Sequence, residues 1–112
     1  MTGAPAGRPL HVVGLGGTVR AGSSSEQALR IAVDRAAQQG ATTRVFGGAE
    51  PATLPTYSPE RGDGGSVAHD LVAHLRRADG VVIASPGYHG SISGLVKNAL
   101  DYTEDMRADP LP

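Results

Sequence analysis

The sequence has no cysteine, no long apolar run and no excess of charge of either sign. Without cysteine the chain cannot form disulfides, iron–sulfur clusters, thiolate zinc sites or a cysteine nucleophile. No stretch approaches the roughly 18 apolar residues of a membrane span, and residues 1–9 lack the apolar region of a signal peptide. Ten Lys and Arg residues against eleven acidic residues argue against a nucleic-acid-binding surface. We therefore expect a cytoplasmic protein that binds neither membranes nor nucleic acid.

Turn-forming residues are abundant, with 16 glycines and 8 prolines among the 112 residues. They alternate with clear apolar segments, which is typical of a globular protein rather than a disordered one. The length fits one domain. We expect residues 1–9 to form a flexible lead-in, and residues 10–112 to form the domain.

Hydrophobic periodicity predicts strands at residues 10–15, 42–46 and 81–84, each followed by an amphipathic helix. We expect the first helix to place Ala28, Leu29, Ala32, Val33 and Ala36 on one apolar face. Ser66 is the expected N-cap of the second helix, and residues 103–112 are expected to form a loop.

This alternation predicts an α/β protein with a doubly wound parallel sheet and helices on both faces. Residues 81–84 are apolar throughout, so we expect them to form a central strand. Three strands are few for such a sheet. We therefore expect only the first three β–α units of a larger fold, with its C-terminal part outside this sequence.

The loop after the first strand, residues 14–25, has the chemistry of a phosphate site. Its glycines let a ligand approach the backbone, and free N–H groups at the start of the following helix attract anions. The side chains of Thr18, Arg20, Ser23 and Ser25 are the candidate ligands. A dinucleotide fingerprint would need glycine where Val19 stands, and a Walker A loop would need lysine at position 23. The loop therefore favours a monophosphate.

The loop after the third strand, residues 85–94, lies where open α/β sheets bind ligands. A flat heteroaromatic ring could lie along this loop and accept hydrogen bonds from the exposed backbone N–H groups of the loop, with Tyr88 beside the ring. A hydrolytic alternative uses Ser91 as nucleophile and His89 as base, but a nucleophile elbow would need serine where Ile92 stands. In the following helix, Lys97 and Asp101 are spaced as a surface ion pair.

Four segments resemble motifs of the NADPH-dependent FMN reductase family, which has a flavodoxin-like fold. Residues 17–23, Gly-Thr-Val-Arg-Ala-Gly-Ser, are similar to the family's G-S-x-R-x-x-S loop, and Leu-Pro-Thr-Tyr at 54–57 to its L-P-x-Y segment. Pro-Gly-Tyr-His-Gly-Ser at 86–91 and Gly-Leu-Val-Lys-Asn-Ala-Leu-Asp at 94–101 resemble P-E-Y-N/H-G-S and G-x-L-K-N-A-x-D. Gly87 stands where the family usually has glutamate.

The resemblance implies FMN as cofactor and NADPH as reductant. It places the FMN phosphate on Thr18, Arg20, Ser23 and Ser25, and the isoalloxazine ring on Pro86, Gly87, Tyr88, His89, Gly90 and Ser91. It also implies a homodimer or homotetramer with the third helix near the subunit contact. A third flavin-contacting loop of the family follows a fourth strand, which this sequence does not contain.

We expect an NAD(P)H-dependent FMN reductase that transfers hydride to FMN and electrons onward to free flavin, a quinone or another acceptor. The cofactor supplies the chemistry, so no catalytic side chain and no metal are required. Two alternatives stay open. One is a flavin-binding electron carrier without turnover, and the other is a non-catalytic fragment that associates through its exposed third strand.

Overall fold

The computed structural model of the chain describes residues 7–20, 22–60 and 65–108. It has three strands, three α-helices and two 3₁₀ segments, in the order β1 (His11–Gly16), α1 (Ser24–Gln38), β2 (Thr42–Phe46), η1 (Pro51–Thr53), α2 (Ser66–Arg77), β3 (Gly80–Ala84), α3 (Gly94–Asp101) and η2 (Tyr102–Ala108). The predicted alternation of strands and helices is confirmed, and with it the α/β class.

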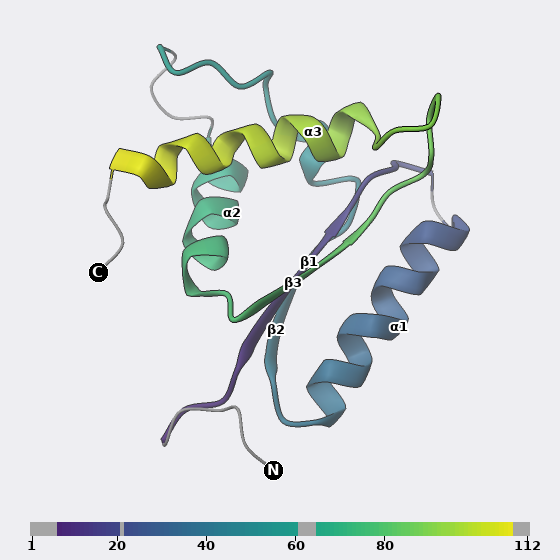
Figure 1. Cartoon of the computed structure of the whole chain (residues 1–112), viewed down its shortest axis with the longest axis vertical. Coiled ribbons are helices and arrows are strands. Elements are labelled where there is room, and N and C mark those ends of the chain that lie inside the picture. The colour runs from purple at the N-terminus through teal and green to yellow at the C-terminus, as the bar shows by residue number, and fades with distance from the viewer. Residues whose placement is uncertain (1–6, 21, 61–64, 109–112) are drawn as a thin grey trace.

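The three strands form one parallel sheet in the order β2-β1-β3. Helix α1 lies on one face of the sheet, and α2 and α3 lie on the other (Figure 1). This is the arrangement of a partial flavodoxin-like fold. None of the described helices has the length and apolarity that crossing a membrane requires.

The main core lies between the sheet and the pair α2 and α3. Alternate residues of β1, Val13 and Leu15, are fully buried there beside Phe46 of β2. The intervening Gly14 faces α1, where a methyl group in its place would lie 2.8 Å from Val33 Cγ2. Strand β1 is therefore covered on both faces, as a central strand must be.

Strand β3, in contrast, lies at the edge of the described sheet, so its prediction as a central strand was wrong for this part of the fold. It pairs with β1 alone, and Val81 and Ile83 remain 45% and 44% exposed. Both pair in register with core residues of β1, so they lie on the face that α2 and α3 only partly cover. The apolar pattern of this strand indicates burial that the described residues do not supply.

Three other expectations need correction. Ser66 is the first residue of α2 and not its cap, because Gly65, with φ of 95°, occupies the cap position without a side-chain hydrogen bond. Residues 103–108, expected as loop, belong to η2, whose first residue, Tyr102, is buried in the core. Ala28 is exposed, whereas Leu29 and Val33 are the buried residues of α1. Residues 1–6 of the expected lead-in and 109–112 of the tail lie outside the described residues.

Candidate functional site

The two loops that were predicted to bind ligand begin side by side. Strands β1 and β3 are parallel neighbours, and their last residues, Gly16 and Ala84, are partners in the ladder. The loop 17–23 and the loop 85–93 therefore leave the same edge of the sheet, as Figure 1 shows at the starts of α1 and α3. This edge carries the carboxyl ends of the strands, where open α/β sheets bind ligands.

Gly17 holds the two loops in direct contact. A methyl group at this position would lie 2.7 Å from Ser93 Oγ and 3.2 Å from the Cα of Ser85. It would also lie 2.7 Å from Val96 Cγ2 in α3. The absence of a side chain at Gly17 is therefore what lets the first loop pack against the base of the second.

The first loop ends in an open helix N-terminus. Ser23 caps α1, since its Oγ accepts a hydrogen bond of 3.1 Å from the N–H of Glu26. The hydroxyl oxygens of Ser23 and Ser25 lie 3.3 Å apart. The N–H groups of Ser24 and Ser25 have no acceptor among the described residues. These groups and the positive end of the helix dipole make the start of α1 suitable for an anion.

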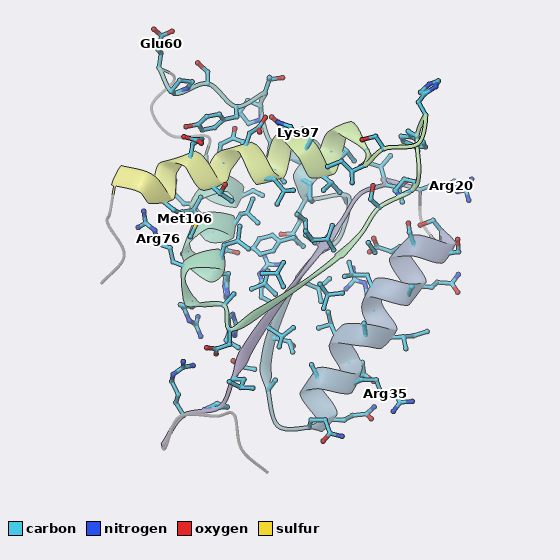
Figure 2. The ribbon with its side chains drawn as sticks, viewed as in Figure 1. Arg20, Arg35, Glu60, Arg76, Lys97 and Met106 are labelled. Atoms are coloured by element: carbon cyan, nitrogen blue, oxygen red, sulfur yellow. The ribbon has the colours of Figure 1, made fainter. Side chains whose placement is uncertain are left out.

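Thr18 and Arg20 complete this loop. Thr18 Oγ1 accepts a hydrogen bond of 3.1 Å from the backbone N–H of Arg20, which fixes the turn. The Arg20 guanidinium forms no hydrogen bond or ion pair with any described residue and is exposed. Figure 2 shows Arg20 at the same edge of the sheet as the start of α1. The loop therefore offers one unpaired positive charge beside the helix N-terminus.

A third segment, residues 47–48, packs against the first loop. Sequence reasoning did not assign this segment to the site. Gly48, two residues after the end of β2, packs against the backbone of Thr18 so closely that a methyl group there would lie 1.7 Å from the Thr18 carbonyl oxygen. Glu26 of α1 reaches the same segment, with Oε1 3.4 Å from the N–H of Gly48. A cavity of about 230 Å³ lies between this segment and Thr18, Val19 and Arg20. The glycine pair at 47–48 was the only sequence signal for this contact.

The second loop is a short hairpin that is closed at its base. Ser85 Oγ accepts a hydrogen bond of 2.8 Å from the N–H of Ser93 and donates one of 2.9 Å to the Pro86 carbonyl. At the tip, Tyr88 and Ser91 exchange two backbone hydrogen bonds of 3.0 and 2.9 Å. The two residues between them, His89 and Gly90, both have positive φ, 51° and 76°.

The positive φ values suit Gly90 but not His89. Two central residues with positive φ are characteristic of a type I′ turn, which favours glycine and asparagine, so His89 holds a strained conformation. The N–H groups of His89 and Gly90 have no acceptor among the described residues. They are therefore available to a ligand, as the sequence predicted for this loop.

The hydrolytic alternative gains no support from the geometry. Within the described part of the chain, the His89 ring and the Ser91 hydroxyl form no hydrogen bond. A nucleophile and its base need such contact.

Large apolar side chains are exposed on both loops. Val19 of the first loop is 64% exposed, and Tyr88 and Ile92 of the second are 55% and 44% exposed. Exposed apolar side chains gathered around polar groups mark ligand or partner surfaces. The site edge thus combines a cationic loop with apolar surface, which fits a ligand with an anionic end and a flat ring.

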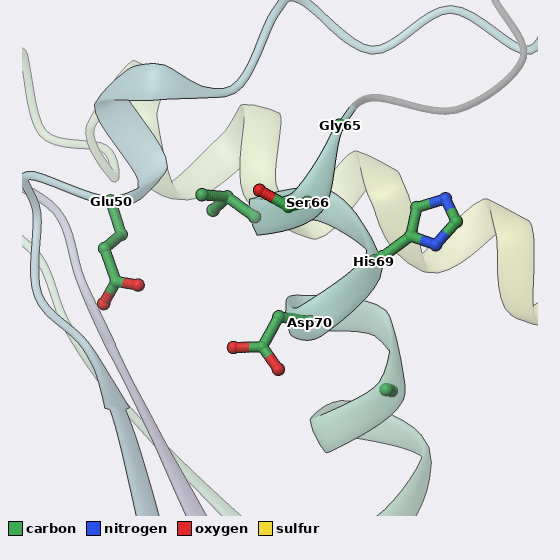
Figure 3. A pocket seen from close by; sticks show the side chains of 7 residues that line it. Glu50, Gly65, Ser66, His69 and Asp70 are labelled. Atoms are coloured by element: carbon green, nitrogen blue, oxygen red, sulfur yellow. The ribbon is translucent and has the colours of Figure 1, made fainter.

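A larger hollow of about 860 Å³ lies between η1 and α2 (Figure 3). The carboxylates of Glu50 and Asp70 face into it, whereas the His69 ring points away from Glu50. Both carboxylates are bound by Arg44, at 2.8 Å to Glu50 and 2.7 Å to Asp70. Hydrogen bonding to Glu50, above all, raises the pKa of Arg44. Arg44 therefore engages both carboxylates, but its single positive charge offsets only one of their two negative charges.

The segment 54–57 binds α3 and not the ligand loops. Asn98 of α3 accepts a hydrogen bond of 2.8 Å from the N–H of Tyr57 and donates one of 3.1 Å to the Pro55 carbonyl. The Tyr102 hydroxyl donates to the same carbonyl at 2.7 Å, and the Tyr57 and Tyr102 rings pack edge to face. Lys97 and Asp101 form the expected exposed ion pair on the outer side of the helix.

Comparison with known proteins identifies relatives of this chain by sequence. Residues 10–111 match the family model for NADPH-dependent FMN reductase. The chain is 33% identical over 103 residues to the NADPH-dependent FMN reductase ArsH of Shigella flexneri, across 88% of this chain and 38% of that protein. It is 50% identical over 43 residues to an FMN-dependent NADPH-azoreductase of Staphylococcus saprophyticus, covering 37% of this chain and 23% of that protein.

A quinone reductase of Escherichia coli is 44% identical over 41 residues, covering 37% of this chain and 22% of that protein. The chain thus spans at most 38% of the length of these three relatives. The family model nevertheless covers both ligand loops and the helices that follow them. This chain belongs to the NADPH-dependent FMN reductase family.

Proposed function

We propose that this chain forms the phosphate loop and the ring-binding loop of an NAD(P)H-dependent FMN reductase. The observation that carries the proposal is the contact at Gly17, which holds the two loops together at the carboxyl edge of the sheet. One loop presents a helix N-terminus and a guanidinium that no described residue pairs, and the other presents N–H groups without a described acceptor beside exposed apolar side chains.

The residues present fit FMN. Its phosphate would be held by Arg20, by the N–H groups of Ser24 and Ser25 and by the hydroxyls of Thr18 and Ser25. Ser23 would contribute mainly by capping α1, because its oxygen already accepts the Glu26 N–H. The isoalloxazine ring would lie on residues 86–91, with Tyr88 as an apolar neighbour.

The chemistry that bound FMN supplies is transfer of hydride from NADPH to an acceptor such as free flavin, a quinone or an azo compound. The residues of this chain would bind the FMN and orient its ring. The N–H groups of His89 and Gly90 would donate hydrogen bonds to negative charge on the ring. The closed hairpin keeps these donors fixed, so little reorganisation is needed when charge develops.

The proposal also covers the oligomeric state of the protein and its cellular compartment. A homodimer or homotetramer would form near α3, because Val81, Ile83 and Ile92 leave apolar surface exposed on β3 and on the loop before α3. The compartment would be the cytoplasm, where NADPH is supplied. Light scattering after size-exclusion chromatography tests the assembly, and a single species at the monomer mass would contradict it.

Titration of the chain with FMN, followed by quenching of flavin fluorescence, tests the binding site. We expect Arg20→Ala to weaken FMN binding at least about tenfold, because a hydrogen bond to a charged group contributes on the order of 1.5–3 kcal/mol. Arg35→Ala is the matched control. It removes the same charge from the opposite end of α1, as Figure 2 shows. Equal affinities for the two variants would contradict the phosphate loop.

Addition of NADPH to the FMN-bound chain under anaerobic conditions tests the reductase. Rapid bleaching of the flavin absorbance is the expected result. Flavin that binds but does not bleach would leave the binding site intact and favour an electron carrier without turnover.

A further inference from the structure

The side chain of Glu26 lies between the ends of β1 and β2, beside the candidate phosphate loop. Glu26 is the third residue of α1, and its side chain is 17% exposed. A methyl group in place of Gly16 would lie 2.8 Å from Glu26 Oε1, and one in place of Gly47 would lie 2.7 Å from Oε2. The carboxylate therefore fills the space that these two glycines leave open where the strands end.

The sequence around Glu26 predicts a different contact from the one the structure has. Residues 23–26, Ser-Ser-Ser-Glu, match a capping box, in which the glutamate side chain binds the backbone N–H of the N-cap residue. Ser23 Oγ does accept the Glu26 N–H at 3.1 Å, but the Ser23 N–H donates to the Arg20 carbonyl at 3.3 Å. The Glu26 carboxylate instead reaches the segment after β2, where Oε1 accepts the N–H of Gly48 at 3.4 Å.

This segment is the one that packs against Thr18. Gly48 lies so close to the Thr18 backbone that a methyl group does not fit between them, and Thr18 Oγ1 accepts the N–H of Arg20 at 3.1 Å. Glu26 thus connects the start of α1, which has N–H groups suitable for an anion, with the turn that carries Arg20. The carboxylate fixes the two halves of the candidate phosphate site relative to each other.

The position of this carboxylate is unfavourable for binding an anion by charge alone. It lies at the positive end of α1 and lines the same cavity as Arg20. Arg30, which is exposed, offsets its charge in part through a contact of 3.0 Å to Oε2. A negative charge beside an anion site repels the anion. A purely electrostatic role of Glu26 therefore predicts that removal of the charge tightens phosphate binding.

We propose that Glu26 is a positioning residue of the candidate phosphate loop, acting through Gly48 and Thr18 on the donors for the FMN phosphate. The inference rests on the proposed function, because it concerns the same site. Glu26 itself is not a ligand of the phosphate. Its carboxylate keeps the supporting segment in place, so that the loop is ordered before FMN binds and loses less conformational entropy on binding.

FMN titration of two variants separates position from charge. Glu26→Ala removes the charge and the acceptor for Gly48, whereas Glu26→Gln removes the charge and keeps an oxygen in the place of Oε1. We expect Glu26→Ala to raise the dissociation constant for FMN about fivefold, the effect of one lost hydrogen bond, and Glu26→Gln to raise it less than about twofold. Tighter binding by both variants would reduce the role of Glu26 to electrostatics and overturn the proposal.

Asp34→Ala is the matched control for the loss of charge. Asp34 lies on the same helix, is exposed and accepts a hydrogen bond from Gln38. This variant removes one negative charge from α1 without touching the segment after β2, so FMN binding should stay unchanged. Weakening equal to that of Glu26→Ala would show that the effect is not specific to Glu26.

Riboflavin, which has the ring and the ribityl chain of FMN but no phosphate, tests whether the effect is local. Glu26→Ala should leave the dissociation constant for riboflavin unchanged, and an equal loss of affinity for both flavins would contradict a role in phosphate binding. Arg20→Ala distinguishes this inference from the proposed function. If Arg20→Ala weakens FMN binding and Glu26→Ala does not, the positioning role alone is wrong. If Arg20→Ala has no effect, the phosphate loop itself is wrong.

The ¹⁵N–¹H spectrum of the free chain tests the positioning without FMN. We expect Glu26→Ala to shift the amide resonances of Thr18 and Arg20, and Glu26→Gln to keep them near their positions in the unmodified chain. Glu26→Asp keeps the charge but is one methylene shorter, so it should shift them as Glu26→Ala does, and it serves if the alanine variant does not fold. Unchanged Thr18 and Arg20 resonances in the shortened variants would overturn the proposal, whether or not FMN binds.

Discussion

At the scale of single residues, the site depends on glycines that bring separate segments into contact. Gly17 joins the two ligand loops, and Gly48 supports the first of them through the backbone of Thr18. Neither glycine has positive φ, so its role is close approach and not an unusual backbone conformation.

The contact at Gly48 predicts a sharp effect of one methyl group. Gly48→Ala places Cβ 1.7 Å from the Thr18 carbonyl oxygen, and a backbone atom cannot move aside as a side chain can. We expect a loss of about 1–3 kcal/mol in the free energy of unfolding, typical of overpacking, and shifted amide resonances around Thr18. Chemical denaturation and NMR measure the two effects.

Gly94→Ala is the control for this substitution. A methyl group at Gly94, the first residue of α3, meets no atom within 4 Å. Its unfolding free energy should stay close to that of the unmodified chain. If the two variants were equally stable, the close approach at Gly48 would not exist in solution.

His11 predicts how stability depends on pH. Burial, with help from Arg77, lowers the pKa of His11 below its ordinary 6.5 in the folded state. The unfolded chain therefore binds a proton more readily, and stability falls as the pH drops below 6.5 toward the folded-state pKa. Denaturant midpoints at pH 7.5 and 5.5 measure this, and His11→Gln should reduce the difference. A chain more stable at pH 5.5 would contradict the sign.

At the scale of elements, the two sides of α3 make different contacts. Its inner side binds the segment 54–57 through Asn98, which makes two hydrogen bonds to that backbone. Its outer side carries the exposed Lys97–Asp101 pair. Its N-cap, Ser93, closes the second candidate ligand loop through a hydrogen bond to Ser85.

This arrangement predicts different effects for neighbouring residues of one helix. Asn98→Ala leaves the Tyr57 N–H and the Pro55 carbonyl without the amide partner, so we expect a loss of about 1–3 kcal/mol in unfolding free energy. Lys97→Ala removes only an exposed pair and should cost less than about 1 kcal/mol. Urea denaturation of both variants compares them. An equal cost would mean that the segment 54–57 is not held by α3.

The sequence predicts elements well where periodicity is strong. The apolar runs of β1 and β2 and the faces of α1 and α2 led to elements whose boundaries differ from the structure by few residues. The cap of α2 was misplaced because Gly65 has no side chain to signal it. The 3₁₀ segment η2 was missed because its polar residues hide the burial of Tyr102.

At the scale of the whole molecule, sequence order alone predicted that the two candidate ligand loops share one edge of the sheet. Parallel strands put both ligand loops at one edge, so Arg20 and Tyr88 could be assigned to it from their loops. The support by Gly48 could not be predicted, because it is a contact between segments about 30 residues apart that no local pattern encodes.

The central claim is that both loops bind one ligand, and an NMR titration of the ¹⁵N-labelled chain with FMN tests it most directly. We expect amide shifts with a single dissociation constant in residues 18–25 and 86–91, and none at His11, at the opposite end of β1. Shifts in the phosphate loop alone, or different dissociation constants for the two loops, would contradict a joint FMN site.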